Sequence, residues 1–452
     1  DPVARIKHLI QAQYRAAPRE VKCVFLFGHV PVAYSGSIMP DGHGPDHQGA
    51  WPCDGYYGDM DGVWTDRTVK ETRASNPRNH NVPGDHKFDQ NFFPAPLKLM
   101  VGRVDLANMP GRLAWGGPPT FPSELELLRN YLNKDHKFRT HQLDLPPRAL
   151  VGDFFGLHDG EAFAASGWRN LAPLLGPDHV SQLPEPGTWI STLSRTPCLW
   201  AYGCGPGTYE SIAGLGTTDR HYSGTTAELV HHDVKAAFIL LYGSWQGDWD
   251  AEDDLLRSVL ALPTYGLACA WSGRPHWFLH HMGLGETIGF GARLTQNNGP
   301  DGLYHTEVNT AAGQIHIALM GDPTLRLQSV APPSDLTGTT NAAGLTLRWT
   351  ASDDSVLGYH VYRAASPDGP FTRLTPSPVA GTSCTIASAE GAANYMVRAI
   401  KLETSASGTY FNLSQGAFPE PAAGANSPSA PLARHAPSPS AQGSEHPAAG
   451  AG

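Results

Sequence analysis

The sequence predicts an α/β protein whose mostly parallel sheet is sandwiched by helices, followed by a small antiparallel β-sandwich and an irregular tail. Up to residue 330, apolar runs typical of buried strands alternate with segments of helical periodicity, as in a parallel sheet covered on both faces. Over 333–415, short strands of alternating polarity are separated by turn residues, which is typical of a sandwich. Residues 417–452 are mostly Ala, Pro, Ser and Gly, so we expect them to be disordered.

The overall composition argues against several classes of protein. The chain of 452 residues has a formal net charge of −10 and no basic stripe, so nucleic acid is not an expected partner. It has no run of about 18 apolar residues, so we expect no membrane-spanning helix. Six cysteines occur without a Cys-x-x-Cys pair, which argues against a zinc knuckle or a thioredoxin-like site. The first residues, DPVARIKHLI, show no export signal and indicate a mature start or a fragment.

The chain begins with a helix and a strand and then enters a long irregular segment. Apolar residues at helical spacing predict a helix over 4–17, and the continuous apolar run at 21–28 predicts a buried strand. Residues 29–95 form an insert that is rich in Gly, Pro, Asp and His and therefore in loops. A second buried strand is expected at 97–104.

The rest of the α/β region alternates between strands and helices. A helix is expected over 122–138, where Ser123 and Glu126 can form a capping box. The elements that follow are a strand at 147–155, a helix at 160–176, a strand and then a Gly-rich loop over 196–207, a strand and then a loop over 234–249, a helix at 254–262, a strand and then a loop over 265–277, a helix at 284–298 and a closing strand at 315–328.

Three loops after these strands form the candidate site. In parallel sheets, ligands bind at the carboxyl ends of the strands. This rule places the loops 203–208, 243–249 and 271–277 along one edge of the sheet. The first of them holds Cys204 between glycines, directly after a buried strand.

The insert carries acidic side chains that could bind a metal ion. Asp59, Asp61, Asp66, Asp85 and Asp89 lie in Gly-rich loops, and such carboxylates suit a hard cation such as Ca²⁺. The Asp-x-Asp-Gly piece is not a full EF-hand loop, so the alternative is that these residues cap turns.

A second metal candidate in the insert uses histidine. The stretch DGHGPDH places His43, Asp46 and His47 together, and two histidines with a carboxylate can hold Zn²⁺. The Gly-Pro loop that carries them does not fix their geometry as a helix would.

Residues 333–415 resemble a fibronectin type III domain. LTLRWTAS supplies a buried tryptophan, Trp349, GYHVYRAASPDGPFTRL resembles the central strand pair, and YMVRAI resembles the late strand. The resemblance implies a spacer or adhesion unit.

Residues 1–330 resemble the gingipain-like cysteine peptidases, which share the caspase-type α/β fold. VFLFG resembles the first-strand motif of that family, DGYYGDMDG its Tyr-Tyr-x-Asp-x-Asp-Gly segment, and LKLMVGRVDL its Val-Gly-Arg strand. GETIGFGARL resembles the helix behind the site, and ALMGDPTLRL resembles the closing Gly-Asp-Pro strand. The resemblance implies a caspase-like sheet, export from the cell and a capacity to bind calcium.

The chain departs from this family at the catalytic dyad. The family keeps a histidine in a Gly-His-Gly loop after one strand and a cysteine after the next, because an imidazole must assist a thiol that attacks a carbonyl. Here the first position reads Gly203-Cys204-Gly205, and Ser244 occupies the second. A cysteine is a poor general base, and a serine without a base is a poor nucleophile.

Two functional hypotheses follow. In the first, the protein is a secreted or cell-surface, peptidase-like protein that has lost catalysis and acts in binding or surface assembly, with a protein or peptide as its ligand. In the second, it is an active cysteine peptidase or hydrolase in which Cys204 is the nucleophile and a neighbouring histidine assists. His276, which follows the next strand, is the main candidate for that histidine, and His221, His280 and His281 are the others.

Overall fold

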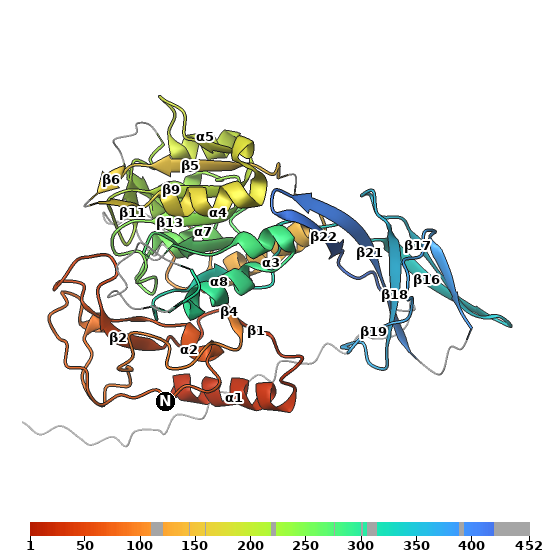
Figure 1. The fold of residues 1–452 in the computed structure, drawn as a ribbon, viewed down its shortest axis with the longest axis horizontal. Helices are drawn as coiled ribbons and strands as arrows, with labels where there is room; N and C mark the ends of the chain where they lie inside the picture. The colour runs from red at the N-terminus through yellow and green to blue at the C-terminus, as the bar shows by residue number, and fades with distance from the viewer. Residues whose placement is uncertain are drawn as a thin grey trace, which may run out of the picture.

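The computed structural model describes residues 1–109, 121–143, 145–158, 160–217, 223–274, 276–299, 302–304, 314–387 and 393–419. Its centre is an eight-stranded sheet, as the sequence predicts (Figure 1). The strands lie in the order β1 (Cys23–Phe27), β4 (Met100–Val104), β15 (Leu319–Gly321), β14 (Ala268–Trp271), β13 (Ala236–Tyr242), β9 (Cys198–Cys204), β5 (Ala149–Asp153) and β8 (Val180–Gln182).

The sheet is mostly parallel. Every neighbouring pair of strands is parallel except β14 and β15, so β1, β4 and β15 run opposite to the other strands. The strands β5, β9, β13 and β14 are neighbours that run the same way, so their carboxyl ends share one edge. The shared edge expected from the sequence is confirmed.

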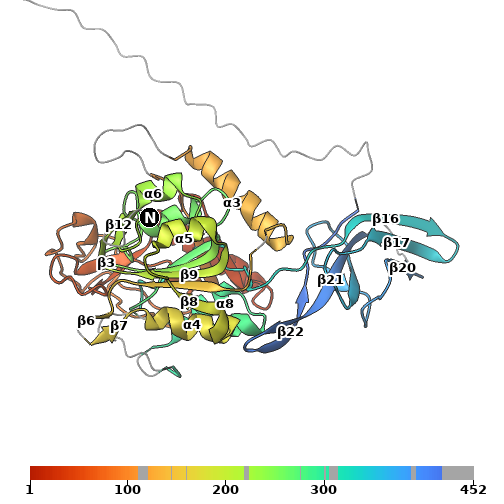
Figure 2. The same ribbon diagram turned by 90° about the horizontal axis from the view of Figure 1, so that it is seen from above.

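Helices cover both faces of this sheet, with α3, α5 and α6 on one side and α4 and α8 on the other (Figure 2). The capping box at Ser123 and Glu126 is present at the start of α3 and confirms that prediction. The bounds of the helices are α1 (Pro2–Ala16), α3 (Glu124–Arg139), α4 (Ala165–Leu175), α5 (Trp189–Arg195), α6 (Thr226–His231), α7 (Leu255–Leu260) and α8 (Ile288–Asn297), with short 3-10 turns η2 (Pro177–His179) and η3 (His280–Leu284).

The insert contains little regular structure. Its elements are the antiparallel pair β2 (Tyr34–Ile38) and β3 (Gly49–Pro52), the short helix α2 (Gly55–Gly58) and the turn η1 (Pro77–Asn79). Two smaller sheets lie beyond the carboxyl ends of β5 and β9: β6 (Leu157–His158) with β7 (Glu161–Ala162), and β10 (Gly207–Thr208), β11 (Ser211–Ala213) and β12 (Ser223–Thr225).

The C-terminal part is a β-sandwich with its own core. One sheet contains β16 (Ser334–Asn341), β17 (Gly344–Thr350) and β20 (Ser383–Ile386), and the other contains β19 (Thr372–Arg373), β18 (Gly358–Ala364), β21 (Asn394–Ser405) and β22 (Gly408–Leu413). Trp349 is buried between the sheets against Tyr359, as expected.

The end of the sandwich and the predicted tail overlap slightly. Ala417 still exchanges backbone hydrogen bonds with Val397 of β21, and residues 420–452 of the predicted tail lie outside the described residues. Within the described part of the chain, no helix has the length and apolar character needed to cross a bilayer.

Candidate functional site

Cys204 is the last residue of β9 and lies between two neighbouring strands. It pairs in register with Asp153 at the end of β5 and with Tyr242 at the end of β13. The glycines around it allow close packing, because a Cβ on Gly205 would lie 2.3 Å from the carbonyl oxygen of Ala213 in β11. The β10–β12 sheet therefore lies directly against the strand end.

The Cys204 thiol is in an environment that keeps it protonated. The side chain is fully buried, and its sulfur donates to Oδ1 of Asp153 at 3.4 Å. Burial, and then the negative charge of Asp153, raise the pKa of the thiol well above its usual range. The same oxygen of Asp153 accepts the backbone N–H groups of Phe155 and Gly156, which fixes the carboxylate in place.

Ser244 follows Gly243, the first residue after β13, and is half-buried. The next residue, Trp245, has a φ of +74°, which is a costly conformation for a bulky side chain. Its backbone N–H donates to Asp41 of the insert at 3.1 Å. Its ring stacks on His47, with centroids 4.2 Å apart, and more loosely on His43 at 5.2 Å. Contacts with the insert thus hold the corner that carries Ser244.

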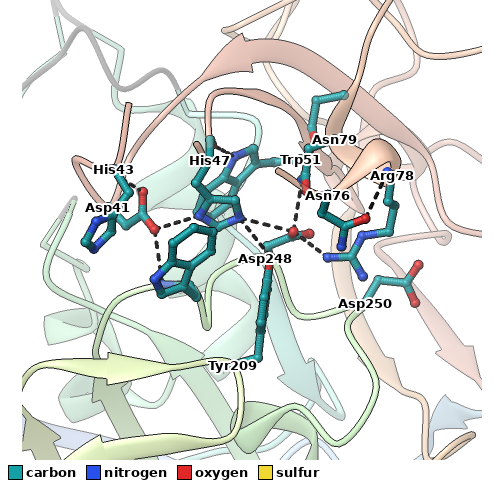
Figure 3. Close-up of polar contacts among 12 residues, drawn as sticks. Asp41, His43, His47, Trp51, Asn76, Arg78, Asn79, Tyr209, Asp248 and Asp250 are labelled. Carbon is teal, nitrogen blue, oxygen red and sulfur yellow. Dashed lines mark hydrogen bonds and ion pairs between the residues drawn. The ribbon is translucent and has the colours of Figure 1, made fainter. Parts of the chain in front are cut away.

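His47 is the centre of this contact (Figure 3). The imidazole is fully buried, with Nδ1 2.7 Å from Asp41 and Nε2 3.2 Å from Asp248, the latter in the loop after β13. The Tyr209 hydroxyl also lies 3.4 Å from Nε2. Burial opposes the charged ring, but the hydrogen bonds and charges of Asp248 and Asp41 outweigh it and raise the pKa of His47. Both ring nitrogens are therefore engaged by carboxylates.

Asp248 is also bound by two other insert residues. It accepts a hydrogen bond from the Arg78 guanidinium and another from Asn79 Nδ2 at 2.9 Å. Burial alone would lower the pKa of Arg78, but the charge of Asp248 raises it. Asp41, His47, Asp248 and the half-buried Arg78 thus form one group of polar and ionic contacts, and we call it the insert clamp.

A second ionic contact fixes the insert to β4. Arg103, which is fully buried, forms two hydrogen bonds of 2.8 Å to Asp54, and its guanidinium lies 4.9 Å from the Trp249 ring. Asp105 lies 3.5 Å from Arg103 and 3.6 Å from Arg257 of α7. The insert and the loop after β13 are therefore held by buried charges at two places.

Four of the insert carboxylates expected to bind calcium, those of Asp59, Asp66, Asp85 and Asp89, accept hydrogen bonds from the surrounding loops. Asp59 is buried and accepts from the backbone of Asp61 and from the Trp64 indole. Asp66 and Asp85 each accept from two backbone N–H groups, and Asp89 accepts from three and from one hydroxyl group. Burial alone would raise the pKa of Asp89, but these hydrogen bonds hold it well below its usual range.

These contacts are what turn capping requires. Asp61 is mostly exposed and lies 3.5 Å from the Lys98 ammonium group. Within the described ranges, no three His, Cys, Asp or Glu side chains are grouped as metal ligands would be. The calcium site stays a prediction, and so does a zinc site at His43, Asp46 and His47.

The histidines proposed to assist Cys204 lie in different surroundings. His276 is buried in the loop after β14. His280 and His281 belong to η3, where His280 lies 3.0 Å from the Tyr304 hydroxyl. His221 lies outside the described residues.

Sequence reasoning missed the residues that surround His47. Trp245 and Asp248 lie in the expected site loop 243–249, but their contact with His47 was not expected, and Asp41 and Arg78 were not among the expected site residues. The signal that could have found them is the acidic run 248–254, which directly follows a predicted strand end and faces a His-rich insert.

The fold therefore defines the class of protein: an α/β protein with a mostly parallel sheet covered by helices on both faces, joined to a C-terminal β-sandwich. No protein-family model and no curated protein matches the chain. One similar solved structure is described as "Structure of Protease"; it is 14% identical, with a TM-score of 0.47, and the match covers 91% of this chain and 87% of that one. A Fn3-like protein from Clostridium thermocellum is 20% identical over 20% of this chain and 92% of its own, with a TM-score of 0.16.

Proposed function

We propose that this protein is a secreted or cell-surface binding protein whose peptidase-like α/β unit no longer hydrolyses peptides. The observation that carries the proposal is the state of Cys204, which is fully buried and hydrogen-bonded to a carboxylate. A cysteine nucleophile reacts as the thiolate, and catalytic cysteines lie in positively charged, partly exposed surroundings. Cys204 lies in the opposite environment, because Asp153 disfavours the negative sulfur.

The insert clamp supports the same conclusion from the neighbouring strand. A general base needs a ring nitrogen free to accept a proton. His47 lies against the residue after Ser244, but Asp41 and Asp248 engage both of its nitrogens. In this position it stabilises the loop and does not serve the serine hydroxyl.

A binding role also suits the rigidity of this edge. The clamp fixes the loop after β13 to the insert, and the pair formed by Arg103 and Asp54 fixes the insert to β4, before any partner arrives. Loops that are ordered in advance lose less conformational entropy on binding. A protein or peptide is the ligand class that we propose.

A peptide-library screen tests this proposal. The parent, Cys204→Ala and Ser244→Ala are incubated with a broad fluorogenic library, and cleavage is followed by fluorescence and mass spectrometry. We expect no turnover above buffer in any of the three. Turnover in the parent that Cys204→Ala abolishes would instead establish the active cysteine hydrolase.

A further inference from the structure

A hairpin of the sandwich folds back onto the α/β unit. The strand β22 contacts η3, and the turn between β21 and β22 contacts α4. There, Ser407 Oγ donates to the carbonyl oxygen of Pro173 at 2.7 Å, and Ser405 Oγ donates to that of Gly283. Further along the hairpin, the Tyr410 hydroxyl donates to Gln328 at 3.0 Å. The hydrogen bonds of Ser405 and Ser407 therefore fix the position of the turn relative to the end of α4.

A cavity of about 320 Å³ lies beneath this turn. Its apolar floor includes Leu174 from α4, Leu199 from β9 and Leu327, and its roof is Thr404–Ala406 of the turn. Ligand pockets start at about 300 Å³ and occur preferentially where structural units meet. The volume suits one long side chain or a small molecule.

The charges around the cavity favour a cation. The carboxylate residue Asp178 lines it, and the described residues of its wall include neither lysine nor arginine. The C-terminal end of α4, at Leu175, also contributes to the wall, but its carbonyl oxygen is already bound by His179, so Asp178 is the group that favours a cation. His179 Nδ1 lies 2.8 Å from the Leu175 carbonyl oxygen, so this nitrogen carries a proton and donates it.

We propose that this cavity binds an alkylammonium or alkylguanidinium group, with its methylene stem on the leucine floor and its charged head at Asp178. A lysine or arginine side chain of a partner protein has this chemistry, and so does a free diamine. The site is distinct from the edge that carries Cys204, so it does not depend on whether that edge is catalytic.

A neighbouring cavity favours the side chain of a longer chain over a free diamine. This second space of about 170 Å³ shares Leu199, Leu327 and Gln328 with the first. Glu403, which is only 5% exposed, lines it, with Oε1 3.3 Å from the Lys401 ammonium group. A peptide that placed one basic side chain under the turn would have room to continue along this wall.

Binding of a short labelled peptide to the full chain tests the proposal. The probe is a five-residue peptide, Gly-Leu-Lys-Leu-Gly, and its matched control has norleucine in place of lysine. Fluorescence polarisation should show binding of the lysine peptide and at least tenfold weaker binding of the norleucine peptide. Equal binding of the two peptides, or no binding of the lysine peptide, would overturn the proposal.

Two variants locate the site. Asp178 is exposed, so Asp178→Asn should fold normally and weaken binding of the lysine peptide about fivefold. Ala406→Trp fills the space from the turn and should abolish binding. The control is Asp368→Asn, which changes an exposed carboxylate of the β-sandwich that does not line the cavity. Equal losses at Asp178 and Asp368, or full binding by Ala406→Trp, would contradict the assignment.

Competition with 1,5-diaminopentane separates the two sources of the group. Displacement of the peptide at a diamine concentration close to the peptide's own Kd would assign the cavity to a free diamine. Displacement only at a concentration at least a hundredfold higher would assign it to a side chain of a longer partner. The peptide-library screen is a separate readout, so turnover there would refute the proposed loss of catalysis and leave this site standing.

Discussion

The imidazole of His47 lies against the indole of Trp245, with ring centroids 4.2 Å apart and planes tilted by 24°. This contact joins the insert to the residue that follows Ser244, and the two carboxylates on either side of the ring fix it in place. The loop that carries Ser244 is thus held by a buried histidine whose two ring nitrogens contact Asp41 and Asp248.

Replacing this histidine should destabilise the protein strongly. His47→Gln leaves two buried carboxylates without their shared positive charge, and the loss of one partner from a buried ionic group typically costs about 3–5 kcal/mol. His43→Gln is the matched control, since His43 is exposed, stacks loosely on Trp245 and acts on Asp41 through its charge and its backbone N–H, and it should cost less than about 1 kcal/mol. Urea unfolding gives the loss of unfolding free energy for each variant. Equal losses for His47→Gln and His43→Gln would contradict a stabilising role of the insert clamp.

The clamp should also depend on pH. The pKa of His47 is raised in the folded protein, so its contribution is fully present below about 6.5, the usual value of histidine, and is lost as the pH rises through the raised value. The pKa of Asp41 is lowered: burial acts against this, but the hydrogen bond from His47 and its charge outweigh it. Its contribution is present above about pH 4 and is lost as the pH falls through the lowered value.

The difference in unfolding free energy between the parent and His47→Gln should therefore be largest between about pH 4 and 6.5 and shrink toward pH 8.5. The groups that face the ring are Asp41, Asp248 and Tyr209, with Arg78 behind Asp248. Urea titrations at several pH values give this difference. A difference that grows toward pH 8.5 would mean that the buried ring is neutral.

The pair formed by Arg103 and Asp54 should behave as one unit. Arg103→Leu leaves a buried carboxylate uncompensated and should cost about 3–5 kcal/mol. Adding Asp54→Asn removes that charge and should recover at least about 1 kcal/mol. A double-mutant cycle compares the losses of unfolding free energy. If the losses of the two single variants simply add in the double variant, Arg103 and Asp54 are not coupled.

The backbone at Trp245 offers a test of strain. Because its φ is +74°, glycine should be tolerated there better than alanine, by about 1 kcal/mol. Trp245→Gly and Trp245→Ala lose the same ring contacts, so the difference between their melting temperatures isolates the backbone. Alanine equal to or better than glycine would mean that the loop adopts another conformation.

Calcium binding by the insert is tested by removal of the ion. If Asp59, Asp61, Asp66, Asp85 and Asp89 hold Ca²⁺, a chelator should lower the melting temperature by several degrees, and added calcium should restore it. An unchanged melting temperature would leave turn capping as the role of these carboxylates. Magnesium added back in place of calcium is the control for general ionic effects.

The strands at the edge could be predicted because their apolar runs are continuous. LWAYG, FILLY and ACAW each indicate a buried strand, and the helices between them imply parallel neighbours, which is what β9, β13 and β14 form. The reversal between β14 and β15 could not be predicted, because apolar periodicity says nothing about the direction of a strand.

The clamp could not be predicted from local patterns. His47 and Asp248 are 201 positions apart, and their contact depends on how an irregular insert folds over the sheet. The sequence placed His47 beside His43 and Asp46 in a zinc hypothesis, whereas in the fold its partners are Asp41 and Asp248. The contact between Cys204 and Asp153 could not be predicted from local patterns either, because it depends on the pairing of β5 with β9.

The reactivity of Cys204 in the folded protein is the most direct test of the account. Brief alkylation with iodoacetamide at several pH values, followed by peptide mass spectrometry, gives the rate for each cysteine. Cys204 should react more slowly than the half-buried Cys23 and Cys384, at every pH up to about 8.5. Faster labelling of Cys204, with a pKa below about 7 controlling its rate, would contradict the loss of catalysis.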